Sequence, residues 1–191
     1  MSNNKNTQFL LEKFFLMCYY TNMRSLNLTL PKDWVEIPKS LYQTYGITDL
    51  EELPVISAFK MGITSKRICM VQDYGTNVND IIDELLDTNI NMDKKNINKE
   101  ISQIINADVN IKNICIENYR IGGIIPSFIN VIKNSVNPQY YIVQIFLKDQ
   151  GHIICFSFIE TKMDENNPVQ FILKDNAYNT LINKVIPSIK K

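Results

Sequence analysis

The sequence is poor in the residue types from which most catalytic and metal sites are built. It has one histidine, His152, which excludes a metal site held by several histidines. Its four cysteines, Cys18, Cys69, Cys115 and Cys155, lie far apart, and no pair has the CxxC spacing of a zinc site or a redox motif. The last three lie in apolar runs, which favours buried free thiols in a reducing compartment. The sequence therefore predicts neither a metal nor a cofactor.

An excess of charge of either sign is also absent, because 20 Lys and Arg residues balance 20 Asp and Glu residues. This balance argues against a nucleic-acid binder and gives no reason to expect electrostatic attachment to a membrane. With 45% hydrophobic and 21% charged residues, the chain is too apolar to be disordered, and its length of 191 residues favours a single domain. The abundance of Ile and Asn indicates an AT-rich genome of bacterial or phage origin.

No export signal or membrane span is recognisable near the N-terminus. Residues 9–20 read FLLEKFFLMCYY, but Glu12 and Lys13 interrupt the apolar run and no Ala-x-Ala cleavage site follows it. Twelve residues are too few to cross a bilayer as a helix. We therefore expect a cytoplasmic protein without a membrane span.

Hydrophobic periodicity predicts the order helix, strands, helix, strands, helix. Residues 1–24 are expected to be an aromatic helical extension, and residues 25–191 a single α+β domain with a mainly antiparallel sheet flanked by helices. Residues 39–52 read as a short helix and a loop. Strands are expected at 25–30, 55–61, 67–72, 109–111, 114–120, 128–133, 140–148 and 152–160, and helices at 8–23, 78–88 and 176–189.

Two glycine-containing segments read as turns. Lys148–Gly151 (KDQG) is the strongest hairpin signal in the chain, because glycine readily adopts the positive φ that a tight hairpin needs. The pair Gly122–Gly123 predicts a bulge or a sharp turn between strands. Neither GxGxxG, GxxxxGK[ST] nor GxSxG occurs, so the sequence gives no support for phosphate binding or for a serine nucleophile.

A cysteine nucleophile is the remaining catalytic alternative, with Cys155 or Cys69 as the candidate. His152 would be the base, but Cys155 is three residues further along the same expected strand and should face the opposite side. His152, beside the hairpin turn, reads as an exposed residue at a strand end. The sequence therefore predicts no catalytic residue, and we expect a protein that is not an enzyme.

Three features suit the binding of another protein. The N-terminal helix carries aromatic residues on more than one face, which could bury a partner or a second copy of the chain in a homodimer, although packing on its own sheet explains them equally well. The single tryptophan follows the first expected strand and is either core or a binding hot spot. An acidic ridge on the second helix is either solvated or a docking surface for a basic partner. The candidate partner-binding residues are Phe14, Phe15, Tyr19, Tyr20, Trp34, Asp80, Asp83, Glu84 and Asp87.

The order of these elements resembles the PsbP-like superfamily. The resemblance rests on four features: the strand that ends in Leu30-Pro31-Lys32-Asp33-Trp34, the expected strand and helix at 67–72 and 78–88, the hairpin at 140–160, and the closing helix that ends in IPSIK. The superfamily includes a photosystem II subunit, a Ran-binding nuclear import factor, DcrB-like bacterial proteins and chaperones of Rhs-type toxins. Over residues 25–191 the resemblance implies an α/β/α sandwich and a binding role without catalysis. The aromatic extension departs from this pattern, as does the missing export signal of the DcrB-like lipoproteins.

Together, the residues and the resemblance predict a cytoplasmic adaptor or chaperone that binds a protein such as a secreted toxin or another effector. The alternative is an immunity or anti-defence protein that blocks a toxin or a nuclease, with the acidic ridge imitating a line of phosphates.

Overall fold

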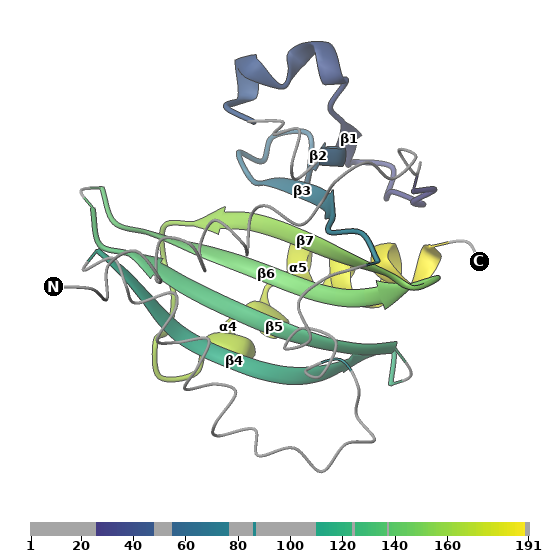
Figure 1. Cartoon of the computed structure of the whole chain (residues 1–191). Coiled ribbons are helices and arrows are strands. Elements are labelled where there is room, and N and C mark those ends of the chain that lie inside the picture. Colours follow the sequence, from purple (N-terminus) through teal and green to yellow (C-terminus); the bar gives the residue numbers. More distant parts are fainter. Residues whose placement is uncertain are drawn as a thin grey trace, which may run out of the picture.

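The computed structural model describes residues 26–47, 55–76, 86, 110–123, 125–136 and 138–189. Seven strands in these ranges form one sheet in the order β1-β2-β3-β7-β6-β5-β4, and every neighbouring pair is antiparallel (Figure 1). The protein is therefore mainly β with some helix, and the predicted antiparallel sheet is confirmed. The strands are β1 Val35–Glu36, β2 Val55–Lys60, β3 Ile68–Asp73, β4 Ile111–Ile121, β5 Ile125–Asn134, β6 Tyr140–Asp149 and β7 His152–Glu160.

Two of the three connections between the long strands β4 to β7 have residues with positive φ. Between β6 and β7, Gln150 has φ 49° and Gly151 has φ 84°, and Asp149 pairs with His152 across the turn. Between β4 and β5, Gly122 and Gly123 have φ 59° and 74°. Both predicted turns are confirmed, and at Gly122, Gly123 and Gly151 the positive φ costs little because glycine has no Cβ.

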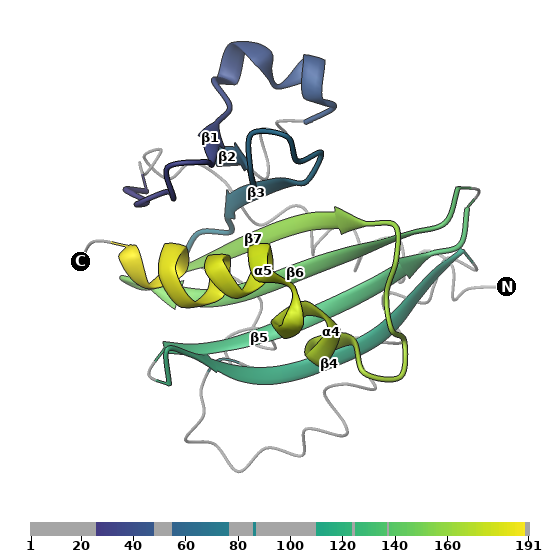
Figure 2. The same ribbon diagram turned by 180° about the vertical axis from the view of Figure 1, so that it is seen from behind.

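Four consecutive helical segments cover one face of the sheet (Figure 2). Proline occupies the first turn of α4, a position where its missing N–H is not needed. The Asp175 carboxylate caps α5 by accepting hydrogen bonds from the backbone N–H groups of Ala177 and Tyr178. The segments are α4 Pro168–Lys174, α5 Asn176–Thr180, the π-helical η3 Leu181–Val185 and the 3₁₀ segment η4 Ile186–Ser188. The predicted closing helix is thus divided into different helical forms, and α4 precedes it.

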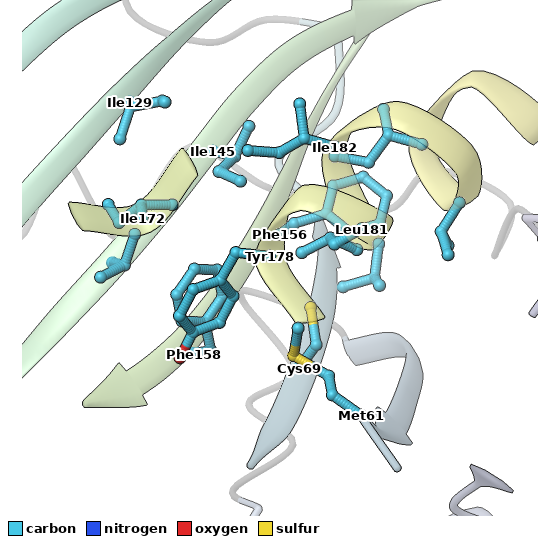
Figure 3. Packing of buried hydrophobic residues seen from close by; sticks show 14 of the residues in the cluster. Met61, Cys69, Ile129, Ile145, Phe156, Phe158, Ile172, Tyr178, Leu181 and Ile182 are labelled. Atoms are coloured by element: carbon cyan, nitrogen blue, oxygen red, sulfur yellow. The ribbon is translucent and has the colours of Figure 1, made fainter. Parts of the chain in front are cut away.

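The main core lies between these helices and the inward-facing residues of the sheet (Figure 3). Phe158 of β7 stacks on Tyr178 of α5 with ring centroids 4.3 Å apart. A smaller cluster lies on the opposite face of β2 and β3. It includes residues that flank the two 3₁₀ segments, η1 Lys39–Leu41 and η2 Gln43–Tyr45, but none from within them. Its buried members are Ile37, Tyr42, Ile47, Val55 and Ala58.

Three sets of predicted elements differ from the structure or lie mostly outside the described residues. The predicted strand at 25–30 is wrong: residues 26–30 form no strand, although Leu26, Leu28 and Leu30 pack on the core. The expected strands at 109–111 and 114–120 form a single strand, β4, with a bulge between Asn113 and Cys115. The predicted helices at 8–23 and 78–88 lie outside the described residues except for Leu86, which is helical and buried.

Candidate functional site

Of the nine predicted partner-binding residues, Trp34 is within the described ranges. It is 8% exposed and stacks on Phe59 of β2, with ring centroids 5.5 Å apart and an interplanar angle of 24°. The backbone N–H of Trp34 donates to the Pro31 carbonyl at 2.9 Å, which closes a turn beside the sheet. The other candidates lie outside the described residues: Phe14, Phe15, Tyr19, Tyr20, Asp80, Asp83, Glu84 and Asp87.

Trp34 also lines a groove of about 670 Å³ between the segment 29–34 and the C-terminal helical segments. This volume is within the range of small-ligand sites, about 300–1,000 Å³. Met61, which follows β2, adds a buried apolar contact. The structure therefore places Trp34 both in the core and at the margin of a groove. The lining residues are Thr29, Leu30, Pro31, Asp33, Trp34, Met61, Asn176, Ala177, Thr180, Lys184 and Ser188.

The helical wall of the groove presents a polar row, Asn176, Thr180, Lys184 and Ser188, at intervals of four residues. Residues four apart in a helix share a face. Ser188 Oγ donates to the Val185 carbonyl at 2.6 Å and accepts from Thr29 N–H at 2.8 Å, so it ties the segment 29–34 to the last helical turn. We did not predict this row from the sequence; its signal was the four-residue spacing of polar residues in the closing helix.

A second feature is a set of exposed apolar side chains near β1. Val35 is 45% exposed, Leu41 42%, Tyr45 39% and Ile63 64%, and together they are four of the six large hydrophobic residues that are exposed in the described ranges. We call these four residues the β1-edge group. Val35 pairs with Lys60, whose Nζ lies 3.3 Å from the carbonyl oxygen of Ile63, and Leu41 and Tyr45 belong to η1 and η2 just after β1.

The expectation that His152 is an ordinary exposed strand-end residue is wrong. The residue is only partly exposed, and its Nδ1 lies 2.9 Å from Oδ2 of the buried Asp73 carboxylate. Asp73 Oδ1 also accepts from Gly75 N–H at 2.7 Å. The pair joins the β6–β7 hairpin to the end of β3. The sequence could not predict the Asp73–His152 pair, since the two residues are 79 positions apart.

The described thiols lack the environment of a nucleophile. Cys155 and Cys69 are fully buried, and burial raises the pKa of both far above the usual thiol value. For Cys115, burial first and the nearby Glu117 carboxylate second raise the pKa to about 11. Strand alternation places Cys155 on the sheet face opposite His152, as predicted from the sequence. These thiols are therefore protonated near neutral pH.

The sheet face opposite the helices carries a row of amide side chains. Asn113 Nδ2 of β4 donates to Asn130 Oδ1 of β5 at 2.6 Å, and Asn130 Nδ2 donates to Gln144 Oε1 of β6 at 2.9 Å. Asn130 is 5% exposed. Buried amides need such partners, so the row favours the register in which the three strands pair.

Among the described residues, no three His, Cys, Asp or Glu side chains gather into a group that could hold a metal ion. No helix within the described ranges combines the length and the apolar character needed to cross a bilayer.

Comparisons with known proteins give no family for this chain. No protein-family model matches it, and no curated protein matches it. Among solved structures, it is similar to protein PA94 of unknown function from Pseudomonas aeruginosa, at 8% sequence identity and a TM-score of 0.30. The similarity covers 72% of this chain and 83% of that one. A likeness at this TM-score carries no argument about fold or function.

Proposed function

We propose that the protein is a non-enzymatic, cytoplasmic protein-binding module, an adaptor or chaperone for a partner protein such as a secreted toxin. The β1-edge group is the observation that carries this proposal. Four exposed apolar side chains on β1 and on the segments that adjoin β1 and β2, an edge strand of two residues among them, are the kind of surface that another protein can cover. The protonated thiols also favour binding over catalysis by cysteine.

We further propose that the chain has the PsbP-like α/β/α arrangement, with helices on both faces of the sheet. Helices cover one face of the sheet, and the helical, buried Leu86 is compatible with a predicted apolar helix at 78–88. An experimental structure of the full chain tests it: a helix over 78–88 on the second face supports the arrangement, and a strand or loop there contradicts it.

The binding proposal is tested by a double substitution, Leu41→Asp with Tyr45→Asp, in the tagged full-length protein. Both side chains are exposed, so we expect an unchanged circular dichroism spectrum and Tm. A partner recovered stoichiometrically from the native host by the unaltered protein should be lost with the variant. Val136→Asp is the matched control, because Val136 is 50% exposed in the β5–β6 connection. Equal recovery by all three proteins would contradict a role for the β1-edge group.

The N-terminal extension is tested in the same assay with Phe14→Asp and Phe15→Asp. Loss of the partner by a folded variant would assign the contact to the extension as well. Loss of folding would show that these residues are core.

The alternative function is an immunity or anti-defence protein that blocks a toxin or nuclease. The acidic ridge, Asp80, Asp83, Glu84 and Asp87, supports this alternative by its charge. Reversal of all four charges to lysine should remove protection from a host that expresses the cognate toxin. Undiminished protection would exclude an inhibitor that acts through the ridge.

A further inference from the structure

We infer that the groove beside Trp34 is a binding site for a small zwitterion, namely an amino acid or a short peptide with free termini. The site is separate from the β1-edge group and does not depend on the protein-binding proposal.

Two residues that line the groove carry opposite charges. Asp33 is in the turn between Pro31 and Trp34, and Lys184 is in η3. Both side chains are exposed, and within the described ranges neither forms a hydrogen bond or an ion pair, with each other or with another residue. A ligand with an ammonium group and a carboxylate would supply the opposite charge to each wall.

Neutral polar groups in the same lining add directional contacts. Asn176 offers an amide donor and acceptor, and Thr180 offers a hydroxyl. Neither side chain has a hydrogen-bond partner among the residues described. Both lie on the same helical row as Lys184. The row can therefore meet the backbone amide of a peptide along its length.

The apolar parts of the groove suit an aliphatic side chain. Trp34 and Met61 are buried except for the surface they give to the lining, and Leu30 and Pro31 are partly exposed beside them. A mainly apolar lining with a few placed polar groups is typical of small-molecule sites.

The wall that carries Lys184 has an unusual conformation. η3, Leu181–Val185, is π-helical and lies between α5 and a 3₁₀ segment. Isolated π-helical turns are rare and occur frequently at functional sites. This observation is independent of the charges and points to the same groove.

The experiment uses Trp34 as its reporter, because it is the only tryptophan in the chain. The full-length protein is titrated with L-leucine, with the tripeptide Leu-Ala-Leu, and with the same tripeptide acetylated and amidated. Isothermal calorimetry is run in parallel and detects binding that leaves the fluorescence unchanged. We expect saturable binding of the free-ended tripeptide and loss of binding when both termini are blocked. Saturation by L-leucine as well would assign a free amino acid as the source.

Variants connect the binding to the two charges. Lys184→Met and Asp33→Asn should each raise the dissociation constant about 2- to 5-fold, the range for solvent-exposed ion pairs. Lys174→Met is the matched control, because Lys174 is exposed at the end of α4 and does not line the groove. Three results would overturn the inference: no saturable binding of any probe, equal binding of blocked and free peptides, or equal effects of Lys174→Met and Lys184→Met.

Discussion

Arg67 and Asp175 form an ion pair that joins the start of β3 to the cap of α5. Arg67 Nη1 donates to both carboxylate oxygens, at 2.9 and 2.8 Å. Arg67 Nε lies 2.8 Å from Glu160 Oε1, and the guanidinium lies over the Tyr178 ring at 4.9 Å from its centroid. One side chain therefore links β3, the end of β7 and the helical layer, and holds the helices against the sheet.

Arg67→Met should destabilise the fold by about 1–3 kcal/mol, because it leaves partly buried carboxylates without a counter-charge. Glu160 Oε1 is buried, and its ion-pair partner is Arg67 Nε at 2.8 Å, so this charge depends on Arg67. Urea denaturation measures the effect as a lower midpoint. Lys66→Met, at an exposed neighbouring position, is the control. A midpoint shift no larger than that of the control would show that the Arg67 contacts contribute little.

Glu165 should make stability fall at acidic pH. Its hydrogen bonds from Lys133 Nζ and Tyr141 Oη, both 2.7 Å, lower the pKa of its carboxyl below the usual value. A lowered pKa stabilises the fold above the unfolded-state value of about 4.3, and this contribution is lost as the pH falls through the lower folded-state pKa.

Glu165→Gln should therefore be less stable than the unaltered protein near neutral pH, and the difference should shrink as the pH falls below about 4.3. Urea midpoints across the pH range measure it. A pH-independent difference would mean that the charge of Glu165 is not involved. Glu160 does not affect this comparison. Its burial raises the pKa of its carboxyl, so its effect on the pH dependence of stability is opposite to that of Glu165, but it is the same in both proteins.

Gln150→Asn should stabilise the β6–β7 hairpin. Gln150 is the one non-glycine residue with positive φ among those described, and asparagine tolerates this conformation better than glutamine. We expect a gain of about 0.5–1 kcal/mol, part of the roughly 1–2 kcal/mol that the left-handed conformation costs a residue with a Cβ, measured as a higher Tm. Gly151→Ala should lower the Tm, since Gly151 has φ 84°, a conformation that alanine disfavours. A lower Tm for Gln150→Asn would contradict this account of the turn.

Removal of the His152 ring should leave Asp73 as a buried carboxylate with the Gly75 N–H as its one remaining hydrogen-bond donor among the described residues. We expect His152→Ala to cost about 1–3 kcal/mol, the range for a buried polar group that loses its partner. Urea denaturation measures it, and Asp149→Ala on the other side of the same turn is a comparison for general effects on the hairpin. Equal shifts for both variants would mean that the Asp73–His152 pair adds nothing specific.

The strands were predictable because their side chains alternate between two faces and their turns carry glycine. β6 and β7 lie within a residue of their predicted bounds for this reason. The same alternation led to a wrong strand prediction at 25–30. An extended segment buries alternate side chains whether or not a neighbouring strand accepts its backbone hydrogen bonds. Here Thr29 N–H bonds to Ser188 Oγ instead.

Contacts between residues far apart in the sequence could not be predicted from the sequence. Asn113, Asn130 and Gln144 read as ordinary polar positions of alternating strands, and only the register brings their amides together. Asp33 and Lys184 are likewise far apart in sequence and share a groove only through the packing of the C-terminal helix. Trp34 was identified by residue type, which could not decide between a core residue and a binding hot spot. The structure buries it in the core and places it at the margin of a groove.

The thiols offer a direct test of the non-enzymatic proposal. Cys155 and Cys69 are buried and Cys115 has a pKa of about 11, so the thiolate fraction near neutral pH is very small. In a Cys18→Ser variant, which removes the thiol outside the described residues, brief iodoacetamide treatment of the native protein should add no mass. Treatment in urea should add three adducts, since Cys69, Cys115 and Cys155 are then exposed. A rapid single adduct in the native protein, lost in Cys155→Ser, would instead reveal an activated cysteine and support the enzyme alternative.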